Sequence, residues 1–206
     1  MPYSKKIKQT VAVVMLAGLV GCASSPDANF YLLSAGQSQA LANWGEDSPN
    51  VLIRPISIPA HLNRPEVVYR SDDNRVLINE YDRWAETVDK SIANILSENL
   101  MASLGSERIY THDASFATRP DMIVRVDIKQ FGLMDNGQVT LVATWEIEDK
   151  KHGTKQLHTQ NFQTSPRSES VSNVVEAMSD TIRQLSTSVS ENLIELETSR
   201  TIGTSS

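Results

Sequence analysis

The chain has 206 residues, a formal net charge of −6 at pH 7 and a single cysteine, Cys22. Its first 21 residues hold three of the 19 basic residues and none of the 25 acidic ones, so the remaining 185 residues carry a net charge of −9. This acidic balance argues against nucleic acid or an anionic membrane surface as a partner. One cysteine excludes an intramolecular disulfide, and the length after residue 21 fits a single domain.

The N-terminus reads as a secretion signal. Lys5, Lys6 and Lys8 precede an apolar run from Val11 to Val20, which is only about half the ~20 residues needed to span a bilayer. The run ends in Leu19-Val20-Gly21-Cys22, which resembles the lipobox of bacterial lipoproteins. That resemblance implies cleavage between Gly21 and Cys22, with diacylglycerol and an N-acyl chain on Cys22. The alternative is an ordinary signal peptide with an accidental cysteine.

Several acyl chains would hold the protein to its membrane permanently, because each buried CH₂ contributes roughly 0.8 kcal/mol and one chain binds only marginally. Ala23, rather than an aspartate, follows Cys22, which favours sorting to the outer membrane. Residues 22–29 form the lipidated N-terminus and a polar tether. The seven residues from Ala23 to Asn29 reach at most about 25 Å, so we expect the folded body to stay close to the membrane.

Residues 30–197 are predicted to form one periplasmic α/β domain. Phe30 to Leu33 reads as a first short strand, and Val51 to Ile58 as a strand whose Pro55 suggests an edge position or a bulge. Pro59 and Pro65 bracket a turn. Two further strands, Glu66 to Arg70 and Val76 to Asn79, flank a turn signal and predict a hairpin.

The first long helix is predicted from Asp82, as N-cap, to Leu104, with Gly105 as a left-handed C-cap. Its apolar stripe contains Trp84, Val88, Ile92, Leu96, Leu100 and Leu104, with Ala85 and Ile95 beside it.

A short strand near Arg108 to Tyr110 follows, and then the clearest β pattern of the chain. Residues 122–129 and 139–148 alternate between apolar and polar side chains around the tight turn at 135–137. Residues 156–163 form a more polar strand, which we expect at a sheet edge. A second amphipathic helix begins after Ser168 or Ser170 and ends near Glu197, and residues 198–206 are expected to fray as a flexible tail.

This order predicts an α+β fold, an antiparallel or mixed sheet with two long helices packed on one face. The four histidines, His61, His112, His152 and His158, lack metal-ligand spacing, and there is no nucleophile elbow or phosphate loop. We therefore expect no enzyme activity, no metal and no cofactor other than the lipid on Cys22.

Residues 53–85 carry a more specific resemblance. Pro55, Ile58-Pro59, Leu62, Arg64-Pro65, Val67 to Arg70 and Tyr81-Asp82-Arg83-Trp84-Ala85 together are similar to the PqiC family, auxiliary lipoproteins of MCE-type intermembrane transport systems. Phe30 to Leu33 resembles that family's aromatic strand after the lipidated cysteine. Residues 128–131 and 141–145 resemble its later hairpin.

The resemblance implies a non-enzymatic outer-membrane lipoprotein that faces the periplasm and contributes to envelope integrity. Its partners would be an MCE-domain protein that forms a tunnel across the periplasm and a polytopic inner-membrane protein. We hypothesise that the domain docks the outer end of the tunnel, with candidate partner contacts at Pro59, Leu62, Arg64, Pro65, Tyr81 and Trp84. Trp84 also fits the helix core, and both interpretations stay open for Arg64.

Two rival functions remain open from the sequence. One is an envelope lipoprotein that scaffolds or activates a cell-wall enzyme, and the other is a carrier that encloses a lipid. The 40% hydrophobic content shows no excess over what two helices and one sheet face require. The sequence leaves open the lipid transported, the direction of transport and whether copies form a homo-oligomer.

Overall fold

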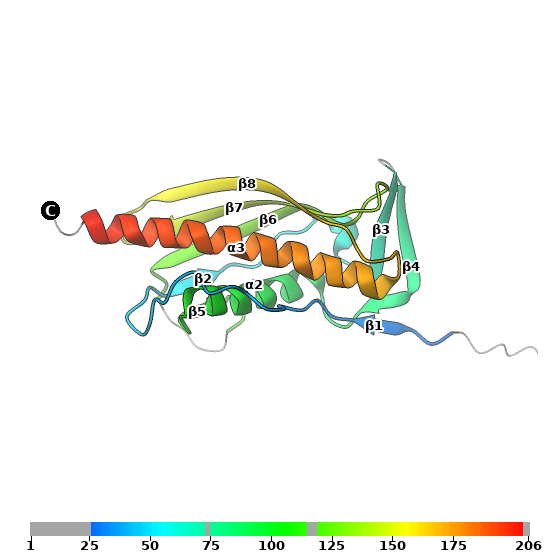
Figure 1. Cartoon of the computed structure of the whole chain (residues 1–206), viewed down its shortest axis with the longest axis horizontal. Coiled ribbons are helices and arrows are strands. Elements are labelled where there is room, and N and C mark those ends of the chain that lie inside the picture. Colours follow the sequence, from blue (N-terminus) through cyan, green and yellow to red (C-terminus); the bar gives the residue numbers. More distant parts are fainter. Residues whose placement is uncertain (1–25, 73–74, 115–118, 204–206) are drawn as a thin grey trace, which may run out of the picture.

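The computed structural model describes residues 26–72, 75–114 and 119–203. It contains two β-sheets and two long helices, and this arrangement confirms the predicted α+β class (Figure 1). The predicted single sheet is wrong in one respect, because the strands of the first hairpin form a separate small sheet. In the described part of the chain, no helix is both long and apolar enough to cross a membrane.

The larger sheet has five strands in the order β5-β2-β6-β7-β8. Its bounds are β2 Val51–Ile53, β5 Ile109–Thr111, β6 Met122–Leu133, β7 Val139–Asp149 and β8 Lys155–Thr164. Strand β2 runs parallel to β5 and β6, whereas β6, β7 and β8 are antiparallel. The sheet is therefore mixed, and β8 lies at its edge as predicted.

The strand predicted from Val51 to Ile58 is interrupted, and of its two predicted alternatives the edge position is wrong. Between Ile53 and Ser57 it carries one residue more than β6 does between Val124 and Asp127, as the predicted bulge requires. Strand β2 ends at Ile53, two residues before Pro55, and it lies between two neighbours rather than at an edge. Proline cannot donate to a strand ladder, so the pairing with β6 breaks at Pro55. It resumes at Ser57, which bridges Asp127 and accepts a hydrogen bond of 2.8 Å from the N–H of Ile128. The chain then crosses the predicted turn, where a 3₁₀ helix, η1 Ala60–Leu62, lies between Pro59 and Pro65.

The two helices, α2 Val88–Leu104 and α3 Val171–Gly203, pack against each other and cover one face of the larger sheet. Helix α3 lies along β6, β7 and β8, and α2 lies beside β5 (Figure 1). Alternate residues of β6 and β7 point into this core, as the sequence pattern predicts. Those with almost no exposed surface include Met122, Val124, Ile128, Leu141 and Ile147.

Helix α2 begins later than predicted. Thr87 is its N-cap, and Asp82 and Trp84 belong to a strand instead. Trp84 lies four positions before Val88 and so fits the apolar stripe of the helix, but with Asp82 it also fits the two-residue period of a strand. Pairing with two other strands decides this ambiguity. The C-terminal end is as predicted, because Gly105 adopts the left-handed conformation with φ +61°.

Helix α3 is longer than predicted, since it continues past Glu197 to Gly203. Arg200, on this extra length, forms an ion pair with the buried carboxylate of Asp149, with 3.2 Å between Nε and Oδ2. The contact joins the end of α3 to the end of β7. Arg200, which lies beyond Glu197, therefore contributes an ion pair to the folded body.

The smaller sheet has three strands in the order β1-β4-β3, with bounds β1 Asn29–Tyr31, β3 Glu66–Asp72 and β4 Arg75–Trp84. Strands β3 and β4 form the predicted antiparallel hairpin. Strand β1, the first after the tether, pairs in parallel with the second half of β4. The small sheet stands at one end of the molecule, at the start of α3, where the chain from the N-terminus also enters (Figure 1).

Candidate functional site: the small sheet beside the tether

Three segments that carry the family resemblance meet at the base of the small sheet. The backbone N–H of Trp84 donates a hydrogen bond of 2.7 Å to the carbonyl of Pro65, and the N–H of Ala85 donates one of 2.9 Å to the carbonyl of Tyr31. The aromatic strand after the tether, the Arg64-Pro65 pair and residues 81–85 are thus hydrogen-bonded neighbours. They are up to 54 residues apart in the chain, so only the fold brings them together.

A buried carboxylate holds this junction from the inside. Asp82 accepts hydrogen bonds from Asn29 Nδ2 at 2.8 Å and from the Tyr31 hydroxyl at 3.0 Å. Burial, together with this bond and the nearby negative charge, raises the pKa of Tyr31. Burial and the charge of Asp82 also raise the pKa of Tyr69 to about 12. Both phenols therefore stay protonated at neutral pH, and Tyr31 can act as the donor.

A second charged cluster lies on the outer side of the same junction. Arg64 Nε donates to Glu66 Oε2 at 2.8 Å. Arg83 Nη2 lies 3.8 Å from Glu66 Oε1. The hydrogen bond from Arg64, the backbone and the charge of Arg83 lower the pKa of Glu66 against the opposing effect of burial. Two guanidinium groups thus share one carboxylate.

The structure separates the predicted partner contacts into two groups. Leu62 and Trp84 are buried in the core cluster, so the fold accounts for both side chains. Pro59 and Arg64 are partly exposed, and Pro65 and Tyr81 are exposed. Gly21 and Cys22 lie outside the described residues.

Five exposed apolar residues in or next to the small sheet were not among the partner contacts predicted from the sequence. Phe30 and Leu32 lie in and just after β1, and the others are Val76, Leu77 and Ile78 in the distal half of β4. A half-buried strand alternates between apolar and polar residues, whereas 76–78 are three apolar residues in a row. Their exposed fractions, between 40% and 45%, show that both faces of the hairpin are accessible there. The uninterrupted run was the signal that could have revealed this.

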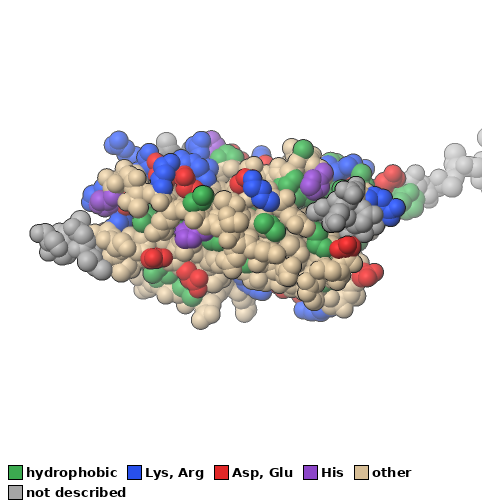
Figure 2. Space-filling model, turned by 90° about the horizontal axis from the view of Figure 1, so that it is seen from above, with side chains coloured by type: hydrophobic (Ala, Val, Ile, Leu, Met, Phe, Trp, Pro, Cys, Tyr) green, Lys and Arg blue, Asp and Glu red, His purple; other side chains and the backbone are tan. Residues whose placement is uncertain are grey.

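Elsewhere the surface is mixed. Seen from above, over β8, hydrophobic side chains are scattered among basic and acidic ones (Figure 2). Leu157 is an exposed apolar residue of β8, distant in the fold from the small sheet. Single residues of this kind are normal on protein surfaces. The grouped apolar residues of the small sheet are therefore the feature that needs a functional explanation.

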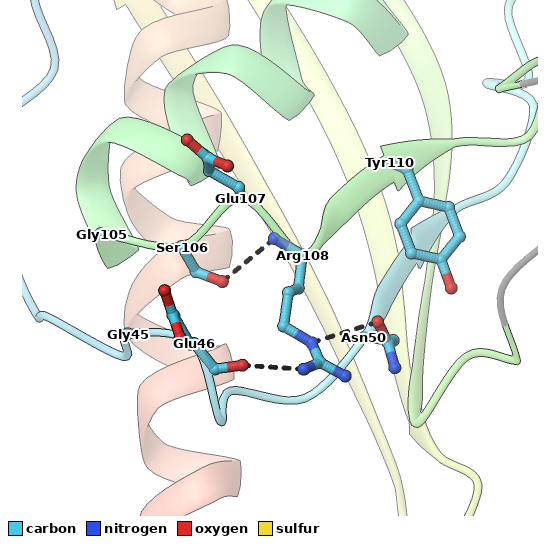
Figure 3. Close-up of a pocket in the computed structure, with 8 residues that line it drawn as sticks. All are labelled: Gly45, Glu46, Asn50, Gly105, Ser106, Glu107, Arg108 and Tyr110. Atoms are coloured by element: carbon cyan, nitrogen blue, oxygen red, sulfur yellow. Dashed lines mark hydrogen bonds between the residues drawn. The ribbon is translucent and has the colours of Figure 1, made fainter. Parts of the chain in front are cut away.

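A hollow of about 550 Å³ lies at the opposite end of the molecule, beside the C-terminal end of α2 (Figure 3). Arg108 lines it and donates from Nη1 to the carbonyl of Glu46 at 2.7 Å and from Nε to Asn50 Oδ1 at 3.3 Å. The chain itself thus engages the guanidinium, and the hollow gives no basis for assigning a ligand. Among the described residues, no group of three or more His, Cys, Asp or Glu could hold a metal ion.

Comparison with known proteins supplies the remaining evidence. Residues 31–190 match the model of a family described as ABC-type transport auxiliary lipoprotein component. The intermembrane transport lipoproteins PqiC of Escherichia coli K12 and of Shigella flexneri are each 25% identical over 142 residues, which cover 68% of this chain and 73% of theirs.

Two solved structures share the fold. The protein XCC0632 from Xanthomonas campestris superimposes with a TM-score of 0.68 at 14% identity, over 84% of this chain and 99% of its own. An uncharacterized protein superimposes with a TM-score of 0.65 at 18% identity, over 82% of this chain and 99% of its own. At these identities the likeness concerns the fold alone.

Proposed function

This chain belongs to the family of ABC-type transport auxiliary lipoprotein components, and from that premise we propose that it is a lipid-anchored accessory subunit of an intermembrane lipid transport system. The match covers most of the chain, and with the PqiC relatives it confirms the resemblance inferred from the motifs. In this proposal, Cys22 carries the lipid, the body faces the periplasm from the outer membrane, and the protein performs no catalysis.

The observation that carries the proposal is the junction at the base of the small sheet. The residues of the family resemblance could have been scattered over the core, where they would explain only the fold. Instead, several of them meet next to the strand that the tether enters, and Pro65, Tyr81 and Arg64 keep exposed surface there. This supports a role for the anchor-proximal end of the molecule.

The tether sets the position of that end. Asn29, the first residue of β1, is the seventh residue after Cys22, and seven residues span at most about 25 Å. Helix α3 has 33 residues and is therefore about 50 Å long. The small sheet stays near the membrane in every orientation that the tether allows, whereas the far end of α3 can point into the periplasm.

We propose that the MCE-domain tunnel protein contacts the distal half of the β3–β4 hairpin. Val76, Leu77 and Ile78 are exposed there on both faces of the strand. A protein partner could bury these side chains at about 25 cal/mol per Å² of apolar surface, which suits a specific interface better than permanent exposure to water. Pro59, Arg64 and Pro65, at the base of the same hairpin, would lie at the rim of this contact.

The test is photo-crosslinking in cells, with a crosslinking amino acid at Leu77 and a matched control at Leu157, an exposed leucine on the other sheet. We expect a crosslink from position 77 to the MCE-domain protein and none from position 157. A crosslink from position 77 to a cell-wall enzyme would support the alternative, a scaffold or activator of that enzyme. Persistent absence of any product from position 77 would contradict docking through the hairpin.

A Cys22→Ala substitution tests the anchor separately. The described core begins at Leu33, so this variant should fold normally. We expect it to leave the outer-membrane fraction and to lose support of the transport pathway. A Cys22→Ala protein that still fractionates with the outer membrane and sustains the pathway would contradict the anchoring part of the proposal.

A further inference from the structure

We infer that Phe30, Leu32 and Tyr81 form a second membrane contact, which inserts into the same phospholipid bilayer that holds the lipid on Cys22. These three residues are named here the β1 apolar surface. The inference rests on the proposed anchor and adds to it, because it assigns protein side chains, and not only the acyl chains, to the bilayer.

The side chains of this surface share one face of the small sheet. Exposure alternates along the chain, with Phe30 at 67% and Leu32 at 57%, while Tyr31 is half-buried and Leu33 is buried. In the parallel pairing, Phe30 lies opposite Arg83. Tyr81, exposed at 46%, precedes Arg83 by two residues and is therefore a diagonal neighbour of Phe30 on that face. The opposite face holds Asp82 and Trp84, which are buried.

The fold keeps this surface rigid. Tyr31 and Asn29 are hydrogen-bonded to Asp82, and the carbonyl of Tyr31 accepts a hydrogen bond from Ala85. These bonds hold β1 flat against β4, so Phe30 cannot turn inward without breaking them. The large exposed apolar area of Phe30 is thus a stable property of the folded state rather than a loose end.

The chemistry of the surface suits a lipid headgroup boundary. Phenylalanine and leucine bury well in acyl chains, and tyrosine favours the interface, where its ring is in the apolar region and its hydroxyl remains hydrated. Arg83 and Arg64 stand beside the surface and share the single carboxylate of Glu66. The Arg83 side chain keeps 43% of its surface exposed, so its guanidinium can also pair with lipid phosphates. The overall acidity of the chain works against general adsorption, so contact should be confined to this surface.

The position of the surface favours a bilayer over a protein as its occupant. Phe30 is the second residue of β1, and only six residues lie between Cys22 and the start of that strand. An apolar side chain this close to an acylated residue meets the bilayer at high effective concentration. Val76, Leu77 and Ile78 lie farther along the hairpin and remain available to a protein partner.

The single cysteine of the chain makes a direct test possible. In the mature protein the thiol of Cys22 carries lipid, so a Phe30→Cys substitution introduces one free thiol for a polarity-sensitive fluorophore. Leu32 and Tyr81 remain in place in this variant. Leu157→Cys, at a residue with 71% exposure on the larger sheet, is the matched control. Both lipidated full-length proteins are reconstituted into phosphatidylcholine vesicles with and without a lipid-borne quencher.

We expect the fluorophore at position 30 to shift its emission to shorter wavelength on reconstitution and to lose at least half of its intensity to the quencher. The fluorophore at position 157 should behave as it does in water. A label at position 30 that matches position 157, in protein that floats with the vesicles, would overturn the inference and leave the anchor intact. Shielding at position 30 that requires a partner protein instead of lipid would also overturn it.

Failure of the lipidated protein to float with vesicles has a different meaning. It would overturn the proposed anchor, and the second membrane contact with it.

A Phe30→Ser/Leu32→Ser variant adds a measurement of partition to vesicles. Both side chains are exposed, so the variant should fold, and in the anchor-free Cys22→Ala background its partition to vesicles should fall at least tenfold. A matched Leu157→Ser change should leave the partition unchanged, and equal partition of both variants would contradict the inference.

Discussion

The phenolic hydroxyl of Tyr31 donates a hydrogen bond of 3.0 Å to the buried carboxylate of Asp82, 51 residues later in the chain. This contact attaches the first strand after the tether to the end of the β3–β4 hairpin. A pull on the proposed lipid anchor would therefore reach the folded body through the small sheet. The bond adds to the backbone pairing with β1 and β3 that makes residues 81–84 the end of a strand and not the first turn of a helix.

Replacement of Asp82 by Ala should loosen β1. The substitution removes the acceptor of Asn29 Nδ2 and of the Tyr31 hydroxyl, and hydrogen bonds to a charged acceptor contribute about 1.5–3 kcal/mol. We expect the free energy of unfolding to fall by that amount and the Ala85 amide, which donates to Tyr31, to exchange faster with deuterium. The exposed carboxylate of Asp27 is the control, since Asp27→Ala should change neither quantity. Normal protection of Ala85 in the Asp82→Ala protein would refute this role.

The stability of the protein should depend on Asp149 at low pH. Burial by itself raises the pKa of this carboxyl, but hydrogen bonds from His152 and the backbone, with the charge of Arg200, outweigh it and lower the pKa. A lowered folded-state pKa stabilises the protein above the ordinary value of 3.8, and this contribution is lost as the pH falls through the lowered value. Asp149→Asn should thus be less stable at neutral pH.

The difference between wild type and Asp149→Asn should then shrink as the pH falls below 3.8. Urea unfolding at a series of pH values measures it. Asp135→Asn makes the same charge change in an exposed turn and serves as the control. A gap between wild type and Asp149→Asn that is constant from neutral to strongly acidic pH would show that the carboxylate's charge is unimportant.

Two truncations test the extra length of α3. A chain that ends at Glu197 lacks Arg200 and its ion pair with Asp149, whereas a chain that ends at Gly203 keeps both. Loss of a partner from a buried charge is destabilising, and Asp149 retains other hydrogen bonds, so we expect a loss of about 1–3 kcal/mol for the shorter chain only. Chemical denaturation of both proteins in the Cys22→Ala background measures this. Equal stabilities would return residues 198–203 to the status of a dispensable tail.

Gly105 and Gly45 form a matched pair for backbone strain. Both have positive φ, +61° and +68°, but a Cβ at Gly105 would lie 3.0 Å from Asn43 Oδ1 and 3.1 Å from Asn43 Cα, whereas one at Gly45 meets nothing within 4 Å. Alanine at Gly45 should cost about 1 kcal/mol from the left-handed backbone alone. Alanine at Gly105 should cost at least twice as much, as measured by thermal unfolding. Equal losses of stability would mean that the backbone at Asn43 moves away from the new Cβ at no cost in free energy.

Local patterns predicted the part of the fold that depends on near neighbours in sequence. The alternation in residues 122–129 and 139–148 and the turn between them specify the β6–β7 hairpin, and the apolar stripes specify both helices. These elements bury one face each, so their period is visible in the sequence. The start of α2 was mispredicted because Trp84 fits the helical and the strand period equally well.

Long-range pairing decided the rest. Strands β3 and β4 form a second sheet with β1 and do not join the larger one. Strand β1 reaches β4 across some 50 residues of chain, and no local pattern records that partner. The same holds for Arg200, whose contribution to stability depends on its ion pair with Asp149 in β7.

The sequence by itself determined the lipobox-like motif at residues 19–22 and the family resemblance, because each is a matter of residue order. Only the tertiary structure decided that Leu62 and Trp84 are core residues while Phe30, Leu32, Val76, Leu77 and Ile78 face solvent. Exposure depends on what the rest of the chain covers. The physical reason is that burial is a property of packed surfaces, and these surfaces come from residues far apart in the sequence.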